Sequence, residues 1–223
     1  RFGHYTELVP KGFVEVGGKP MIIRSIETLL SCGIERIILG TGYKKEAYEA
    51  LQADFPQIET CFSPRYADTN SMYTLYNTRD VIGDDSFLLL ESDLERKAIL
   101  SLLDDEFPDV MLVSSLTKFQ DQYYVEYDRN HILTSCSVDK DALEAKGELV
   151  GIHKLSNTFY RRMCADYATI LESQPKLGYE YELLRMSRSV SPVRVLRVEG
   201  LKWYEIDDEA DLSYAEEQII RYC

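Results

Sequence analysis

The chain has 223 residues, of which 45% are hydrophobic and 28% charged, and its formal net charge is −13. This composition is typical of an ordinary globular protein, and the length lies at the upper end of the range for one α/β domain. The acidic balance excludes nucleic acid as an expected partner, because binding to a phosphate backbone requires a basic surface. We also expect no membrane partner, because no apolar run is long enough to cross a bilayer.

The cysteines are scattered and form no CxxC pair. They are Cys32, Cys61, Cys136, Cys164 and Cys223. This odd number at irregular spacing predicts neither a disulfide framework nor a zinc site, and it favours a reducing, cytoplasmic location.

The first half of the chain alternates between helix and strand patterns. Apolar residues recur at helical spacing from Met21, which follows Pro20, to Cys32, which precedes Gly33. Further helices are predicted at Lys44–Ala53, Met72 to about Val81, and Lys97–Leu103. Buried strands are predicted at Arg36–Leu39, Ile58–Phe62, Ser86–Glu91 and Val110–Ser114. This order predicts an α/β fold with a mainly parallel sheet covered by helices on both faces.

The pattern changes after about Lys118. The strands predicted in this half are a hairpin of Tyr123–Tyr127 and Ile132–Val138, then Leu149–Leu155, Val193–Val198 and Trp203–Ile206. The predicted helices are Thr158–Glu172, Glu180–Arg188 and a last one from about Asp208. We interpret residues 119–190 as a small β-rich subdomain on the substrate side of a single domain.

Acidic residues follow two of the predicted strands. Asp93 comes two residues after the end of the strand Ser86–Glu91, and Asp207 and Asp208 follow Trp203–Ile206. Ligands of open α/β sheets bind beyond the carboxyl ends of the strands, and Mg²⁺ prefers carboxylates together with substrate phosphates. The alternative interpretation is that Asp93 and one of the later pair only cap helices.

Cations and a polar helix entrance provide candidate sites for an anion. The first 24 residues contain Arg1, Lys11, Lys19 and Arg24 against two acidic side chains, although a lysine in a loop is often only solvated. Asn70 or Ser71 stands at the start of a predicted helix, where free backbone N–H groups can receive an anion or a base edge. A simple N-cap explains the same residues.

Several motifs of other enzyme classes are absent from the sequence. It contains no GxSxG, no GxGxxG and no Walker loop, and its three histidines form no nucleophilic triad pattern. The sixteen tyrosines are mostly explained by packing. A few aromatic residues are candidates for a small-molecule pocket, namely those near Tyr124, Tyr179, Tyr181 and Trp203.

The segment PKGFVEVGGKPMIIRSIETLLSCGIERIILGTGY, with Arg1-Phe-Gly before it, resembles the sugar-phosphate nucleotidyltransferases. TNSMYTLY, LLLESDLE, ELVGIHKLS and WYEIDDEADL narrow the resemblance to cytidylyltransferases that act on phosphocholine and, more closely, on 2-aminoethylphosphonate. The resemblance implies a three-layer, Rossmann-like fold with a mixed sheet. It also implies a first strand and a glycine-rich loop upstream of Arg1. We therefore expect the chain to be part of a longer polypeptide, in which it could be fused to another enzyme domain.

The resemblance also implies roles for individual residues. Arg1 and Lys11 would neutralise the β- and γ-phosphates, and Asp93 and Asp207 would bind Mg²⁺. The expected neighbours of the cytosine and the ribose are Thr41, Gly42, Tyr43, Asn70 and Ser71. The expected acceptor residues are Tyr124, Lys154 and Glu180.

The expected activity is transfer of CMP from CTP to 2-aminoethylphosphonate, with release of pyrophosphate. A phosphocholine acceptor is the first alternative, because Tyr124, Tyr181 and Trp203 could cage a quaternary ammonium, whereas Glu180 and Glu205 suit a primary amine. A uridylyl- or thymidylyltransferase acting on a sugar phosphate and a non-catalytic, nucleotide-binding regulatory module are further alternatives. The oligomeric state does not follow from the sequence.

Overall fold

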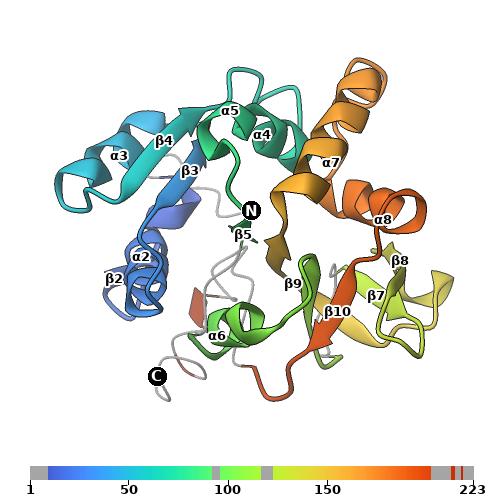
Figure 1. Ribbon diagram of the computed structural model, residues 1–223. Coiled ribbons are helices and arrows are strands. Elements are labelled where there is room, and N and C mark those ends of the chain that lie inside the picture. The colour runs from blue at the N-terminus through green and yellow to red at the C-terminus, as the bar shows by residue number, and fades with distance from the viewer. Residues whose placement is uncertain (1–9, 92–95, 117–122, 202–211, 214–216, 218–223) are drawn as a thin grey trace.

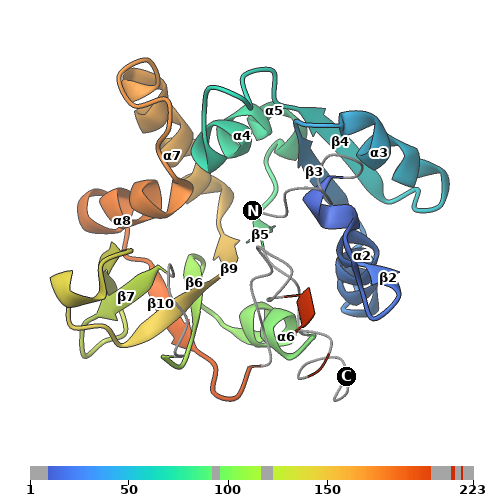
Figure 2. The same cartoon turned by 180° about the vertical axis from the view of Figure 1, so that it is seen from behind.

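The computed structural model describes residues 10–91, 96–116, 123–201, 212–213 and 217. Within these ranges, helices pack on both faces of a set of β-strands (Figures 1 and 2). In that part of the chain, no helix combines the length and the apolar character that spanning a bilayer requires. The predicted α/β architecture is confirmed.

The first half of the chain follows the predicted alternation. Its helical segments are η1 (Lys11–Phe13), α2 (Met21–Ser31), α3 (Lys45–Ala50), η2 (Leu51–Ala53), α4 (Ser71–Asn77), α5 (Arg79–Ile82) and α6 (Arg96–Asp104). Its strands are β1 (Glu15–Val16), β2 (Lys19–Pro20), β3 (Ile37–Thr41), β4 (Ile58–Phe62), β5 (Phe87–Leu90) and β6 (Val110–Ser114). The short hairpin of β1 and β2 was not predicted, because its strands have only two residues each.

Two boundaries in this half differ from the prediction. Strand β3 continues through Gly40 and Thr41, beyond the predicted end at Leu39, because its whole length pairs with β4. The helix predicted from Met72 to Val81 is divided at Thr78 into α4 and α5. The Thr78 hydroxyl donates to the carbonyl oxygen of Leu75 at 2.6 Å, a local side-chain bond of the kind that competes with regular helix.

The second half contains the predicted hairpin, strands and helices. Its elements are β7 (Tyr124–Tyr127), β8 (Leu133–Ser137), η3 (Lys140–Ala142), β9 (Gly147–Leu155), α7 (Asn157–Ile170), α8 (Tyr179–Ser189) and β10 (Arg194–Arg197). The strand predicted at Trp203–Ile206 and the helix predicted from Asp208 lie outside the described residues.

Strand β9 organises the larger sheet. Its carboxyl-terminal half pairs antiparallel with β5 and β6, and its amino-terminal half pairs with β6 and β7. Parallel pairing joins β3 to β4 and β6 to β10. The sheet is therefore mixed, as the resemblance implies, with more antiparallel pairing than the alternation of strands and helices alone predicted.

The two faces of the strands carry different hydrophobic clusters. The aliphatic cluster consists of Ile26, Leu29, Ile37, Leu51, Ile58, Ala98, Ile99, Leu102, Val110, Leu112, Val150, Ile152 and Val198. The tyrosine-rich cluster includes Tyr73, Tyr127, Tyr160, Tyr167 and Tyr179, together with Phe159 and aliphatic residues of α4, α5, α7 and α8. Residues of β6 alternate between the two clusters, because successive side chains of a strand point to opposite faces.

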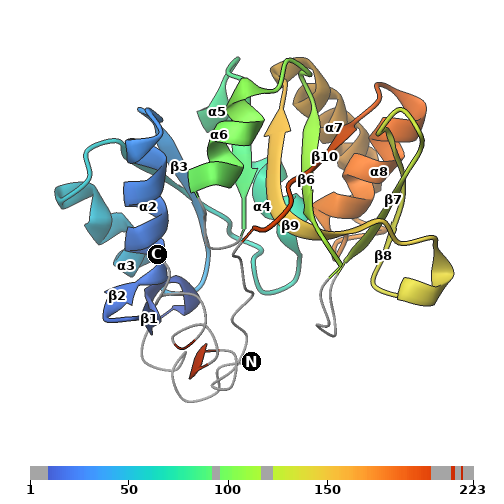
Figure 3. The ribbon, with the colours of Figure 1, turned by 90° about the horizontal axis from the view of Figure 1, so that it is seen from below.

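Apart from the short β1–β2 hairpin, the described strands fall into two groups that do not pair with each other. In the part of the chain that the structure describes, β3 pairs only with β4, and β5 pairs only with β9. Figure 3 shows β3 with α2 and α3 on one side and β6, β9 and β10 on the other. A strand edge presents unpaired backbone N–H and C=O groups, so the space between β3 and β5 is bounded by two such edges.

Candidate active site

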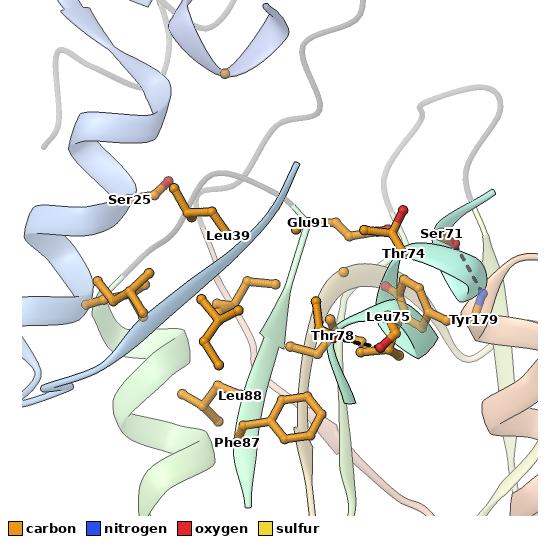
Figure 4. Close-up of a pocket in the computed structure, with 18 of the residues that line it drawn as sticks. Ser25, Leu39, Ser71, Thr74, Leu75, Thr78, Phe87, Leu88, Glu91 and Tyr179 are labelled. Atoms are coloured by element: carbon orange, nitrogen blue, oxygen red, sulfur yellow. Dashed lines mark hydrogen bonds between the residues drawn. The ribbon is translucent and has the colours of Figure 1, made fainter. Parts of the chain in front are cut away.

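A cavity of about 1370 Å³ lies between β3 and β5 and is bounded by α2 and α4 (Figure 4). Most of its depth is lined by apolar side chains of the strands and of the helices that cover them. Ile37, Leu39, Leu88 and Leu90 pack in or against the aliphatic cluster, as the interior of a sheet does. We therefore assign this depth to the sheet interior and not to a polar ligand, and the expected further strand upstream of Arg1 stays a prediction.

Polar groups gather at the carboxyl ends of β3 and β5. Figure 4 shows Glu91, Ser71 and Tyr179 at the same end of the cavity, beyond the apolar side chains of Phe87 and Leu88. This end is the one at which open α/β sheets bind ligands. It is therefore the candidate substrate site, and we call it the polar mouth.

Three of the expected nucleoside-site residues and Lys11, the expected phosphate residue, line the cavity close to β3. Thr41 is buried, and its hydroxyl donates to the carbonyl oxygen of Cys61 at 3.4 Å. A Cβ at Gly42 would lie 2.7 Å from the side chain of Tyr66, so only glycine allows this approach. Tyr43 is 49% exposed, and Lys11 lines the same cavity from the 3₁₀ turn η1. The structure thus brings a cation, a hydroxyl and an exposed aromatic ring to one side of the mouth.

The two residues at the start of α4 have different roles: Asn70 caps the helix, and Ser71 lines the main cavity. The Asn70 side chain accepts a hydrogen bond from the Ser71 backbone N–H at 2.9 Å, so Asn70 acts as an N-cap. Asn70 lines a smaller neighbouring pocket of about 460 Å³, to which Tyr123 and Tyr181 also contribute. Ser71 lines the main cavity, and its Oγ accepts a hydrogen bond from the backbone N–H of Tyr179 at 3.2 Å.

Glu180 is the expected acceptor residue whose surroundings are most unusual. Its side chain lines the main cavity although only 6% of the residue is exposed. Its Oε2 has no hydrogen-bond partner among the described residues, and burial raises the pKa of this carboxyl group. A backbone hydrogen bond to the same carboxyl group opposes part of this pKa rise, but the unpartnered Oε2 still carries a desolvation cost, which a bound cation would reduce.

The other two expected acceptor residues are placed differently. Lys154 lines the main cavity, but it pairs with Leu88, three residues before Glu91, and its Nζ donates to the carbonyl oxygen of Asp105 at 2.6 Å. Tyr124 is buried outside the lining of both pockets, with the Lys140 ammonium 5.5 Å from its ring centre. Neither residue therefore contributes to the polar mouth in this structure.

Three residues that we did not propose as site residues belong to the mouth or support it. Tyr123, the neighbour of Tyr124, lines both pockets, and its ring meets that of Tyr181 at a centroid distance of 5.7 Å. Glu91 lines the main cavity at the end of β5. His153 is fully buried in β9, where its Nε2 lies 3.1 Å from the Tyr179 hydroxyl oxygen. The motif that contains Glu91 and the predicted hairpin that contains Tyr123 were the available signals.

Three predicted site residues, Arg1, Asp93 and Asp207, lie outside the described residues. The described ranges contain no group of three or more His, Cys, Asp or Glu side chains that could hold a metal ion. The expected Mg²⁺ site therefore stays a prediction. The two residues that follow β5, Glu91 and Ser92, are all that separate this strand from Asp93 in the sequence.

Comparison with known proteins gives partial sequence matches and a full-length structural match. No family model matches the chain. The 2-aminoethylphosphonate cytidylyltransferase of Lancefieldella rimae is 31% identical over 94 residues, which are 42% of this chain and 38% of that protein. The choline-phosphate cytidylyltransferase of Streptococcus pneumoniae is 35% identical over 106 residues, which are 44% of this chain and 46% of that protein. The matched part of the chain thus spans less than half the length of these relatives.

The structural match covers nearly all of the fold. The solved structure of CTP:phosphocholine cytidylyltransferase from Streptococcus pneumoniae superimposes with a TM-score of 0.77 at 23% identity. The match covers 97% of this chain and 92% of that one. The chain therefore has the nucleotidyltransferase fold, and part of its sequence is similar to bacterial cytidylyltransferases.

Proposed function

We propose that the chain is a cytidylyltransferase domain that transfers CMP from CTP to a small phosphonate carrying a primary amine, with 2-aminoethylphosphonate as the first candidate. The observation that carries the acceptor assignment is the buried, unpartnered Oε2 of Glu180 in the lining of the cavity. An ammonium group bound there would offset part of the desolvation cost of the carboxylate and lower its raised pKa. The partial sequence similarity to cytidylyltransferases supports the choice of reaction.

In the proposed reaction, an oxygen of the acceptor phosphonate attacks the α-phosphorus of CTP in line. The new P–O bond forms as the bond between the α-phosphorus and the bridging oxygen breaks, and pyrophosphate leaves with that electron pair. The attacking oxygen is already ionised near neutral pH, as for other phosphoryl groups whose second pKa is about 6, so no general base is needed. The main work of the protein is to bring two anions together and neutralise their charge.

The residues of the polar mouth are proposed to divide this work. Lys11, with Arg1, would neutralise the phosphates, while Thr41, Gly42 and Tyr43 would receive the nucleoside beside β3. Ser71 would lie between the two substrates. Mg²⁺ held by Asp93 and Asp207 would supply further positive charge for the departing pyrophosphate.

Phosphocholine is the second candidate acceptor. The edge-to-face pair of Tyr123 and Tyr181 favours it, because both rings line the smaller pocket beside Glu180's helix. Aromatic faces attract a quaternary ammonium, which cannot donate hydrogen bonds to a carboxylate. Binding of 2-aminoethylphosphonate should therefore depend on Glu180, and binding of phosphocholine should depend on this pair of tyrosines.

The test is pyrophosphate release by the purified protein with Mg²⁺, crossing CTP, UTP and ATP with 2-aminoethylphosphonate, phosphocholine and glucose 1-phosphate. We expect release with CTP and 2-aminoethylphosphonate, and its loss in Asp93→Ala. No release from any pair, with CTP still binding, would contradict the proposal and favour a nucleotide-binding regulatory module.

A matched pair of variants tests the acceptor assignment. Glu180→Gln should raise the KM for 2-aminoethylphosphonate at least tenfold and leave the KM for CTP unchanged, because a charge-assisted hydrogen bond is lost. Glu182→Gln is the control, since Glu182 is buried on the same helix but does not line the cavity. Equal effects of the two variants on the KM for 2-aminoethylphosphonate would contradict the assignment of Glu180 to the acceptor site.

A further inference from the structure

The start of α8 forms a wall between the main cavity and the smaller pocket. Tyr179 and Glu180 line the main cavity. The residues on either side of them, Gly178 and Tyr181, line the smaller pocket. Tyr123, which directly precedes β7, lines both. The two pockets therefore adjoin each other along this wall.

Gly178 leaves room for the Glu180 carboxylate at the wall. A Cβ added to Gly178 would overlap Glu180 Oε2, and it would lie 3.8 Å from the hydroxyl oxygen of Tyr123. The φ angle of Gly178 is −77°, which other residues also adopt, so this glycine is explained by space and not by backbone conformation. The carboxylate thus lies against the boundary of the two pockets, near the Tyr123 hydroxyl.

Two hydrogen bonds hold this wall against the start of α4. The Asn70 side-chain amide donates to the carbonyl oxygen of Lys176 at 3.4 Å. The backbone N–H of Tyr179 donates to Ser71 Oγ at 3.2 Å (Figure 4). The two bonds lie on either side of Gly178 in the chain, so the backbone there has little freedom to yield to a larger side chain.

The chemistry at the wall suits a nitrogen that is both charged and substituted. Glu180 Oε2 is buried and has no hydrogen-bond partner among the described residues, so it can accept a bond from an ammonium N–H. In the smaller pocket, the rings of Tyr123 and Tyr181 meet edge to face with their centroids 5.7 Å apart. Aromatic faces attract alkylated ammonium groups, and the pocket volume of about 460 Å³ leaves room for the alkyl substituents.

We infer that the smaller pocket is a subsite for substituents on the acceptor nitrogen, so that the acceptors of this protein include N-methylated 2-aminoethylphosphonates. The ammonium lies at the wall, where an N–H donates to Glu180 Oε2 and the methyl groups point toward Tyr123 and Tyr181. Gly178 determines this specificity, because a side chain there would displace the carboxylate. The inference rests on the proposed function and names the acceptor class of the same site.

The first test compares 2-aminoethylphosphonate with its N-methyl, N,N-dimethyl and N,N,N-trimethyl derivatives in the pyrophosphate assay with CTP. The KM values for the first three should lie within about threefold of one another, because each retains an N–H and the methyl groups enter the aromatic pocket. The KM for the trimethyl derivative should be about tenfold higher, because its nitrogen cannot donate to Glu180.

Tyr181→Ala tests the aromatic part of the subsite. The side chain of Tyr181 is partly exposed, so its removal should be tolerated by the fold. It should raise the KM for the N,N-dimethyl derivative about fivefold more than the KM for 2-aminoethylphosphonate itself. The comparison within one variant controls for any general loss of structure, and an equal change for the two acceptors would overturn the inference.

Gly178→Ala and Gly178→Ser test the wall itself. Both add a Cβ against Glu180 Oε2, so both should raise the KM for 2-aminoethylphosphonate about tenfold. The KM for ethylphosphonate, which lacks the amine, should change much less. Serine caps a helix well and alanine poorly, so a loss seen in Gly178→Ala and absent from Gly178→Ser would trace the effect to the stability of α8 and contradict the inference.

The outcomes for the wild-type protein separate the inference from the proposed function. Release of pyrophosphate with 2-aminoethylphosphonate, but not with its N-methyl derivative, would overturn the inference alone, because the wall would then leave no room for one methyl group. If no acceptor gave release, the proposed function would fail, and the inference with it.

Discussion

The two faces of the strands differ in composition and in what they do for the site. The aliphatic cluster, covered by α2 and α6, contains only aliphatic side chains among its buried members. The tyrosine-rich cluster packs beside buried polar groups, including His153, Glu180 and Glu182. The first face contributes to stability through apolar burial alone, whereas the second face combines burial with hydrogen bonds that orient groups at the polar mouth.

The comparison shows that buried polar side chains lie on the face next to the polar mouth, where substrate recognition is proposed. A buried tyrosine needs a partner for its hydroxyl, and such a partner fixes its orientation. Tyr179 has this arrangement, while residues of the aliphatic cluster such as Ile99 have no polar atoms in their side chains. Substitutions in the aliphatic cluster should therefore change only the stability of the protein. Substitutions on the tyrosine-rich face should also change its pH dependence or its substrate selectivity.

The largest effect is expected in the aliphatic cluster. Ile99 of α6 is completely buried, so Ile99→Ala should lower the free energy of unfolding by about 2–5 kcal/mol through lost burial and a cavity. Urea unfolding measures this change. The KM values of the protein that remains folded should not change, and an altered acceptor preference would contradict the assignment of a purely structural role to this face.

An intermediate effect that depends on pH is expected on the tyrosine-rich face. The side chain of Glu182 is fully buried, and burial raises its pKa from 4.5 to about 7 although Arg185 donates hydrogen bonds to its Oε2. The folded protein then holds a proton that the unfolded chain has already released. The stability that this proton confers is complete below pH 4.5 and is lost as the pH rises through about 7.

Glu182→Gln should remove this dependence. Between pH 4.5 and pH 8, we expect the wild-type protein to lose about 3 kcal/mol of unfolding free energy relative to the variant, which cannot ionise at this position. Urea unfolding across this pH range provides the measurement. Parallel stability curves for the two proteins would show that Arg185 keeps Glu182 ionised throughout.

The smallest effect on stability is expected for exposed ion pairs that lie outside both hydrophobic clusters. Arg36, just before β3, contacts Glu59 with two hydrogen bonds and Asp85 at 3.1 Å, and it donates to the carbonyl oxygen of Val81 at 2.7 Å. It thereby joins the β3–β4 pair to the region that leads into β5. Because these side chains are substantially exposed, Arg36→Met should cost only about 0.5–1 kcal/mol.

A second exposed pair provides the control for Arg36. Lys19 and Glu27 are 2.6 Å apart, but this pair joins β2 only to the adjacent helix α2. Lys19→Met should cost less than Arg36→Met, and both effects should shrink in high salt because exposed charges are screened. Equal costs in low-salt thermal unfolding would show that the connection across the two strand groups contributes nothing of its own.

Most elements of the fold could be predicted from local sequence signals. Hydrophobic periodicity located α2 and β6, and Pro20 and Gly33 marked the limits of α2. The divided helix at Thr78 was missed, because its side-chain bond to the backbone has no distinctive periodicity. The resemblance supplied the mixed sheet, which periodicity alone does not reveal.

The candidate site could be predicted only in part. The proposed residues beside β3 line the cavity, whereas the proposed Tyr124 lies outside this lining and its neighbour Tyr123 is part of it. Neighbouring residues at a strand end point in opposite directions, so an error of one residue moves a side chain from the cavity to the core. Lys154 lines the cavity as well, but its contact with Asp105 could not be predicted, since it joins parts of the chain that are distant in sequence.

The sequence by itself determined the order of helices and strands, the acidic residues after β5 and the chemistry expected at the strand ends, because these depend on near neighbours along the chain. Only the tertiary structure decided that β9 pairs with three strands and that the side chains of His153 and Tyr179 meet. These two residues come from different elements, and no local pattern records the distance between them. Long-range strand pairing and side-chain packing decide such contacts, and both exist only in the folded chain.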